Sequence, residues 1–168
     1  MSDKPAVMVR EVTAADAGAL AAIYNHYVRE TVITFEEEPV TAAEMWHRIE
    51  EVHRTGHPYI VAEEDGEVIG YAYASLWKSR SAYRHTTEST VYLAPGATGR
   101  GAGTALYAAL LDALTTRGFH AVLGGIALPN AASVALHEKL GFRKVAHFEQ
   151  TGFKFGGWVD VGYWERIL

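Results

Sequence analysis

The 168-residue chain contains no cysteine, which excludes disulfide bonds and cysteine nucleophiles and suits a reducing compartment. It lacks any apolar run near the roughly 18 residues that a membrane span needs. Its first residues, Met-Ser-Asp-Lys-Pro, carry no apolar signal region. No run of Lys or Arg is present, and the net charge is −5, which argues against nucleic acid or an anionic membrane as the partner. We therefore expect a cytoplasmic protein that binds neither nucleic acid nor membrane.

The sequence does not indicate a metal site. The eight histidines are scattered, and His53 and His57 have helical spacing only across Gly56, which is expected to end a helix. Internal repeats, linkers and low-complexity stretches are absent. Because 168 residues with a 49% hydrophobic share can bury a sizeable core, we expect one domain over residues 1–168.

The chain is organised around residues 88–103. Residues 86–93 are rich in β-branched and aromatic types and predict a strand, which Pro95 ends because it has no N–H to donate. The glycines that follow allow tight turns and close approach to a ligand. From Thr104, a helix is predicted by the apolar face of Leu106, Leu110, Ala113 and Leu114. A strand, a glycine loop and a helix in this order can direct backbone N–H groups and a helix dipole at an anion.

The loop chemistry narrows the kind of anion. An ATPase-type phosphate loop is excluded because Ala102 stands where that loop needs lysine. A dinucleotide-binding loop is excluded because Leu106 stands in place of its third glycine. The remaining pattern, Thr98-Gly-Arg-Gly-Ala-Gly103, resembles the pyrophosphate loop of the GNAT superfamily of N-acetyltransferases. Thr98 stands where that pattern has Gln or Arg, and Arg100 offers a cation beside it. A glycine-rich surface turn is the alternative.

The remaining patterns predict an alternation of strands and helices. The expected strands are 6–12, 59–64, 67–77, 86–93, 119–127, 142–155 and 158–167, with hairpin turns at Asp65-Gly66 and Gly156-Gly157. The expected helices are 14–29 after Thr13, one from the Thr41 capping box to near Gly56, one from 104, and 131–140 after Asn130. The order βααβββαβαββ predicts an α/β (α+β) fold, a mixed sheet with helices on both faces.

A closer resemblance, to the phosphinothricin and methionine sulfoximine acetyltransferases of that superfamily, covers residues 25–164. The matching pieces are Asn25-His-Tyr27, Phe35, Glu38-Pro39, Trp77-Lys78, Glu88-Ser-Thr-Val-Tyr92, Leu128-Pro-Asn130, His137-Glu138, Leu140-Gly141, Gly152-Phe-Lys154, Gly157-Trp158, Asp160-Val-Gly162 and Trp164. It implies a mostly antiparallel GNAT sheet and acetyl-CoA as co-substrate, with no metal. It also implies a homodimer, although the C-terminal Tyr and Trp residues could equally belong to the core.

The resemblance implies a cofactor site in three parts. The backbone of Val91, Tyr92 and Leu93 would bind the pantetheine and the acetyl carbonyl, because strand N–H groups left unpaired can polarise a thioester. Asn130 would bind the pantetheine arm. The pyrophosphate would lie on the loop of Gly99, Arg100, Gly101, Ala102, Gly103 and Thr104.

Two residues are candidates for proton transfer. Glu88 would remove a proton from the amine, and His137 would act as an acid or as a partner base, since its unperturbed pKa lies near 6.5. A solvent-facing glutamate and a packed histidine are the alternatives. The substrate would be contacted by Phe35, Lys78, Ser79, Arg80, Glu88, Ser89 and Thr90. In this set Lys78 and Arg80 offer cations for a carboxylate or phosphinate, and ordinary solvated charge is the alternative for them.

The function implied is acetyl transfer from acetyl-CoA to the α-amino group of a small amino acid analogue by direct attack on the thioester. The analogue would be of the phosphinothricin, methionine sulfoximine or methionine sulfone type. Two alternatives stay open at this point. The acceptor could be another amino acid, a polyamine or a protein N-terminus, or the chain could bind acetyl-CoA without catalysis.

Overall fold

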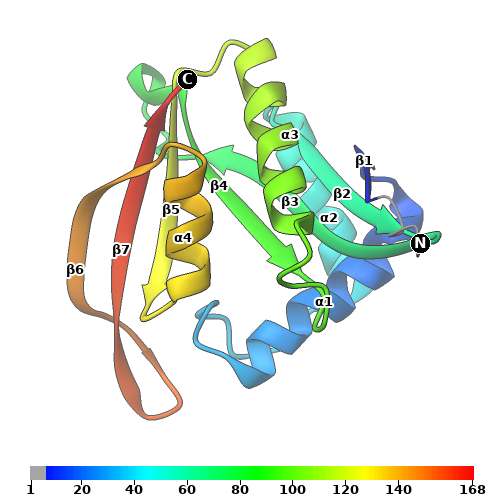
Figure 1. Ribbon diagram of the computed structural model, residues 1–168, viewed down its shortest axis with the longest axis horizontal. Helices are drawn as coiled ribbons and strands as arrows, with labels where there is room; N and C mark the ends of the chain where they lie inside the picture. The colour runs from blue at the N-terminus through cyan, green and yellow to red at the C-terminus, as the bar shows by residue number, and fades with distance from the viewer. Residues whose placement is uncertain (1–6) are drawn as a thin grey trace, which may run out of the picture.

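A single mixed sheet contains all seven strands found in the computed structural model, which describes residues 7–168 (Figure 1). The strands are β1 (Met8–Glu11), β2 (Tyr59–Glu64), β3 (Glu67–Leu76), β4 (Thr86–Leu93), β5 (Ala121–Leu128), β6 (Arg143–Lys154) and β7 (Gly157–Ile167). Their order across the sheet is β1-β2-β3-β4-β5-β7-β6. Neighbours are antiparallel except β4 and β5, which are parallel. The expected mixed, mostly antiparallel sheet is confirmed.

The helices complete the expected order βααβββαβαββ. They are α1 (Ala17–Glu30), α2 (Ala42–Arg54), α3 (Ala102–Thr116) and α4 (Ala131–Lys139), with short 3-10 turns at Ala14–Asp16 and Ser81–Tyr83. The Thr41 hydroxyl accepts a hydrogen bond from the Glu44 N–H, and the Asn130 side chain accepts one from the Ser133 N–H. Both predicted caps therefore begin their helices.

Several boundaries differ from the sequence expectation. Helix α1 begins three residues late, because the Asp16 carboxylate accepts the Thr13 N–H and closes a 3-10 turn first. Helix α3 begins two residues early, at Ala102. The last hairpin turns at Phe155 and Gly156, and not at Gly156-Gly157 as expected. The φ angles of Phe155 and Gly156, 51° and 75°, suit the right-handed twist of the strands. The first strand begins at Met8, and Ala6 lies outside the described residues.

Apolar side chains pack on both faces of the sheet. On one face, Leu106 and Leu110 of α3 pack against residues such as Ile60 and Ala72. On the other face, α1 and α2 pack against Val61 and Tyr71 among others. The expectation of helices on both faces is confirmed, and each face of the sheet has its own core.

The parallel strands β4 and β5 separate along their length. They pair only at Thr86–Ala121, Thr87–Val122 and Glu88–Leu123, and beyond these positions they diverge (Figure 1). The last five residues of β4 therefore have one edge without a strand partner on the β5 side. This divergence creates the opening in which the candidate site lies.

Within the described residues, no helix is long and apolar enough to cross a membrane.

Candidate active site

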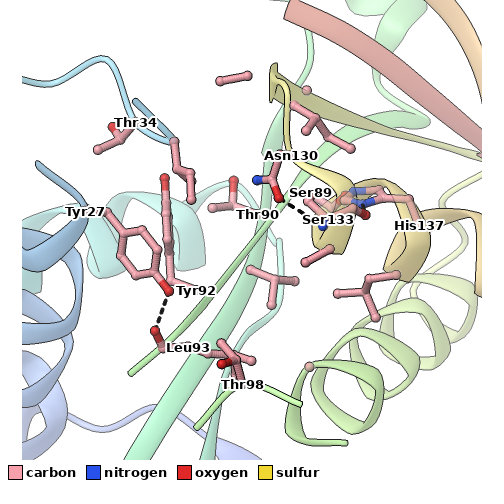
Figure 2. Close-up of a pocket in the computed structure, with 18 of the residues that line it drawn as sticks. Tyr27, Thr34, Ser89, Thr90, Tyr92, Leu93, Thr98, Asn130, Ser133 and His137 are labelled. Carbon is pink, nitrogen blue, oxygen red and sulfur yellow. Dashed lines mark hydrogen bonds between the residues drawn. The ribbon is translucent and has the colours of Figure 1, made fainter. Parts of the chain in front are cut away.

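A cavity of about 700 Å³ occupies the opening between β4 and β5. Its walls come from the end of β4, the glycine loop, the start of α3, the far half of β5, α4, β7 and the loop between α1 and α2. Figure 2 shows Tyr27 and Tyr92 on one side of the cavity and Asn130, Ser133 and His137 on the other. Segments far apart in the sequence therefore meet at the strand divergence.

Most of the expected cofactor residues line this cavity. They are Val91, Tyr92, Leu93, Gly99, Gly101, Gly103, Thr104 and Asn130, and Thr98 lines it too. Gly99 and Gly101 have φ angles of 74° and 90°, the left-handed region that glycine adopts without strain. The loop ends at the N-terminus of α3, where the first backbone N–H groups of the helix lack intrahelical partners. A pyrophosphate would fit this end, because N–H groups and the positive end of the helix dipole converge there.

Two expected cofactor residues, Arg100 and Ala102, are not among the described residues that line the cavity. The Arg100 guanidinium pairs with the Glu64 carboxylate at the end of β2, at 3.1 Å. Ala102 is fully buried at the start of α3. The loop therefore offers an anion backbone N–H groups and the hydroxyls of Thr98 and Thr104, with the guanidinium turned towards β2.

Two hydrogen bonds visible in Figure 2 fix the part of the cavity wall where the pantetheine is expected. The Asn130 side-chain oxygen caps α4, so its amide NH₂ group is left to face a ligand. The Tyr27 hydroxyl donates to the Leu93 carbonyl and anchors the end of β4 to α1. In the sequence Tyr27 belongs to the matching piece Asn25-His-Tyr27, and no local pattern predicts this contact.

The loop between α1 and α2 is held against the cavity by the last hairpin. Lys154 of β6 is only 2% exposed, and its ammonium donates to the Thr34 carbonyl at 2.8 Å. The ring of Phe35 occupies the space over Gly152, where a Cβ would lie 2.7 Å from Cε1 of the ring. Phe35 thereby lines the cavity, as expected for a substrate contact.

Glu88 and His137 lie on opposite faces of the sheet, on either side of Gly124 and Gly125. A Cβ on Gly125 would lie 3.3 Å from the Glu88 Oε1 atom, whereas a Cβ on Gly124 would collide with the His137 ring, 2.8 Å from Cδ2 and closer to Nε2. Consecutive residues of a strand face opposite sides. The two glycines thus make room for one candidate on each face, and a glycine pair inside a predicted strand is a signal of such close approach that sequence reasoning missed.

The geometry determines the protonation of His137. Its Nδ1 atom lies 2.7 Å from the Ser133 carbonyl oxygen, which can only accept, so Nδ1 carries the proton and Nε2 has the lone pair. The ring is held edge-to-face by Tyr107 and Phe142. Burial lowers the pKa of His137 below its usual range, and the bond to Ser133 offsets this only in part. His137 is therefore a neutral imidazole on the cavity wall.

Glu88 lines the cavity. Burial raises its pKa above the usual range, and the positive charge of Lys78 lowers it in part. A desolvated carboxylate in a cavity is a suitable general base. Tyr163 of β7, which sequence reasoning missed, lines the cavity beside it.

The remaining substrate candidates separate into two groups. Ser89 and Thr90 line the cavity, but the Ser89 hydroxyl contacts the Tyr107 hydroxyl and the Leu123 carbonyl on the His137 face. Lys78, Ser79 and Arg80 are exposed and are not among the described residues of the cavity wall. The Lys78 ammonium lies over the Trp77 ring, 5.0 Å from its centroid. Of the two expected cations, Lys78 is the one whose charge acts on Glu88.

Residues 7–168 contain no group of three or more His, Cys, Asp or Glu side chains that could hold a metal ion.

Comparisons with known proteins identify the class. The Acetyltransferase (GNAT) family model matches residues 20–142. A phosphinothricin N-acetyltransferase from Streptomyces coelicolor is 44% identical over 96% of this chain and 96% of that protein. An L-methionine sulfoximine/L-methionine sulfone acetyltransferase from Salmonella typhimurium is 36% identical over 95% of this chain and 94% of that protein. The crystal structure of a phosphinothricin acetyltransferase from Sinorhizobium meliloti with acetyl-CoA matches with a TM-score of 0.94 and 40% identity, over 96% of this chain and 88% of that one.

The diverging strands, the anion loop and these similarities together define an acyltransferase that uses acetyl-CoA as co-substrate. The chain belongs to the acetyltransferase (GNAT) family and is an N-acetyltransferase.

Proposed function

We propose that this enzyme transfers the acetyl group of acetyl-CoA to the α-amino group of a small amino acid analogue of the phosphinothricin, methionine sulfoximine or methionine sulfone type. The observation that carries the proposal is a half-buried carboxylate, Glu88, at the opening between β4 and β5, with a neutral imidazole, His137, on the opposite face. The similarity to enzymes named for these substrates supports the acceptor class.

Acetyl-CoA would lie along the divergence of the strands. Val91, Tyr92 and Leu93 lie where the β5-side edge of β4 has no strand partner. Backbone groups on that edge would take the pantetheine and the thioester carbonyl, and the Asn130 amide would contact the pantetheine arm. The pyrophosphate would lie on the backbone of residues 99–104. These groups fit the co-substrate because they combine an anion-binding helix end with strand N–H groups that can stabilise an oxyanion.

The acceptor amine would enter on the Glu88 face. Glu88 takes one proton from the ammonium group, and the freed amine attacks the thioester carbonyl carbon. The tetrahedral intermediate then loses its second nitrogen proton, the C–S bond breaks, and the thiolate gains a proton. His137 has an unprotonated Nε2, so we assign it the role of accepting that second proton and returning it to the thiolate. A general acid or base of this kind contributes about 10²–10⁴ in rate.

The test is Glu88→Gln, which keeps the shape of the side chain and removes the base. Acetyl-CoA affinity is expected to be unchanged, while coenzyme A release falls by about 10²–10⁴. Because Glu88 acts only when ionised and its pKa is raised, the wild-type rate rises with pH through that raised pKa and then levels. Full activity in the variant would remove Glu88 as the base. A lack of coenzyme A release from wild type with any amine would favour the non-catalytic alternative.

The acceptor is tested by measuring coenzyme A release with a panel of amines. The panel consists of phosphinothricin, methionine sulfoximine, methionine sulfone, the common amino acids, spermidine and a short peptide. Strong turnover with the first three and little with the others is expected. Turnover only with the peptide or spermidine would overturn the acceptor assignment and leave the cofactor assignment in place.

We also propose that the enzyme is a homodimer. Three aromatic side chains, Phe153, Phe155 and Trp158, are exposed by 54% to 64% near the tip of the β6–β7 hairpin. Exposed aromatic patches of this kind are typical of interfaces. Sedimentation should give twice the monomer mass, and Trp158→Glu should shift the mass to that of the monomer. A monomeric wild type would contradict the proposal. The cytoplasmic location stays a prediction.

A further inference from the structure

Tyr163 forms the acceptor-side wall of the cavity next to the proposed base. It pairs with Gly125 across the β5–β7 ladder. A Cβ on Gly125 would lie 3.2 Å from the Tyr163 Cε1 and Cζ atoms and 3.3 Å from the Glu88 Oε1 atom. The phenol ring and the carboxylate therefore border the same small space, which Gly125 leaves open to the cavity.

Two aromatic side chains fix the direction of the Tyr163 ring. Trp77 contacts it edge-to-face with centroids 5.4 Å apart, and Phe148 does so with centroids 5.9 Å apart. Edge-to-face pairs are favourable and orient both rings. The hydroxyl is thus presented in one direction, with little conformational entropy to lose when a ligand binds.

The hydroxyl of Tyr163 makes no hydrogen bond to another side chain or backbone group within residues 7–168. Buried tyrosine hydroxyls usually have a partner. Burial and the nearby charge of Glu88 raise the pKa of Tyr163, so the hydroxyl keeps its proton at neutral pH. A partly buried donor without a partner in the described residues, on the wall of a cavity, is suited to a ligand oxygen.

We propose that the Tyr163 hydroxyl donates a hydrogen bond to an oxygen on the side chain of the acceptor, which makes Tyr163 a specificity-determining residue for oxidised side chains over thioethers. The inference rests on the proposed function. In that function the amino group faces Glu88. We assign the acceptor carboxylate to Lys78, which lies outside the cavity wall but whose charge reaches Glu88. A neutral donor such as Tyr163 then matches a sulfone, sulfoximine or phosphinate oxygen.

The experiment compares methionine sulfone with methionine, which share the amino group and the carboxylate and differ in the two side-chain oxygens. Tyr163→Phe keeps the ring and its contacts with Trp77 and Phe148. It is expected to lower kcat/KM for the sulfone by about 10-fold, mostly through KM, and to change the value for methionine by less than about 2-fold. Where methionine turns over too slowly, calorimetric titration in the presence of coenzyme A gives the same comparison.

Tyr59→Phe is the matched control, because within residues 7–168 the Tyr59 hydroxyl donates a hydrogen bond only to the Met45 sulfur, and Tyr59 does not line this cavity. It should leave both acceptors unaffected. An equal loss for sulfone and methionine in Tyr163→Phe would overturn the inference, since Tyr163 would then act on the shared groups or on Glu88. No change for either acceptor would also overturn it.

The proposed function and this inference fail differently. If wild type acetylates neither methionine sulfone nor methionine, this inference is wrong, and the proposed function is wrong as well if phosphinothricin and methionine sulfoximine are not acetylated either. If wild type acetylates the sulfone and Tyr163→Phe does not change the preference, only the role of Tyr163 falls.

Discussion

Replacing Gly124 of β5 by alanine should lower the free energy of unfolding of the enzyme. The added methyl would lie 2.8 Å from the His137 Cδ2 atom, closer to Nε2, and 3.4 Å from the Tyr107 hydroxyl. The imidazole cannot swing away cheaply, because its Nδ1 atom donates to the Ser133 carbonyl and rings pack on it from two sides. Gly124 does not have a positive φ, so the effect is steric.

The size of the stability loss follows from two opposing effects. Overpacking a tight site costs about 1–3 kcal/mol. Replacing glycine by alanine in a strand or helix returns about 0.5–1 kcal/mol of conformational entropy. The difference between the midpoints of these two ranges is a net loss of about 1 kcal/mol for Gly124→Ala, which for a chain of this size lowers Tm by about 2–4 °C. Gly18→Ala in α1 is the matched control, because nothing lies within 4 Å of its new methyl, and it should raise Tm slightly.

Thermal unfolding followed by circular dichroism measures both variants. The double variant Gly124→Ala/His137→Ala should recover part of the loss, because the imidazole that the methyl meets is gone, and a double-mutant cycle should show a coupling of about 1 kcal/mol. A Gly124→Ala protein that melts with wild type, or a cycle without coupling, would refute the placement of His137 against β5.

Three further predictions follow from single contacts. Arg100→Ala should weaken acetyl-CoA binding by less than about 3-fold in calorimetry, because its guanidinium pairs with Glu64 and Arg100 is not among the residues of the cavity wall. A loss above about 30-fold would mean that it contacts the pyrophosphate. Gly152→Ala should raise the acceptor KM with unchanged acetyl-CoA affinity, because the methyl displaces the Phe35 ring; an unchanged KM would argue against Phe35 in the acceptor site. The Arg10 guanidinium lowers the pKa of Asp16 to about 2, so stability present above pH ~4 should fall by up to about 2 kcal/mol as the pH drops to 2, and Asp16→Asn should abolish this slope in urea titrations.

The sequence determined much of the fold because its signals are local. The Thr41 and Asn130 caps, the Asp65-Gly66 turn and the alternation of strand residues depend on neighbours a few positions away. One boundary was wrong because of a competing contact. That boundary is the start of α1, where the Asp16 carboxylate also pairs with Arg10.

The residues around the site were also largely predictable, because the strand, loop and helix of residues 88–103 lie next to each other in the chain. The directions in which their side chains point were not predictable. Arg100 and Ala102 belong to the predicted loop, yet one side chain pairs with Glu64 and the other is buried. Which way a loop side chain points depends on the element packed beside it, and for Arg100 that element is β2, some thirty-five positions away in the chain.

By itself, the sequence determined the order of elements, the anion loop and the candidates Glu88 and His137. Only the tertiary structure decided that these two lie on opposite faces of the sheet, that Lys154 is buried under the loop between α1 and α2, and that Tyr163 borders the proposed base. The physical reason is that periodicity and capping act within one segment, whereas facing, burial and pairing depend on the register of β5 with β7 and on packing between distant segments.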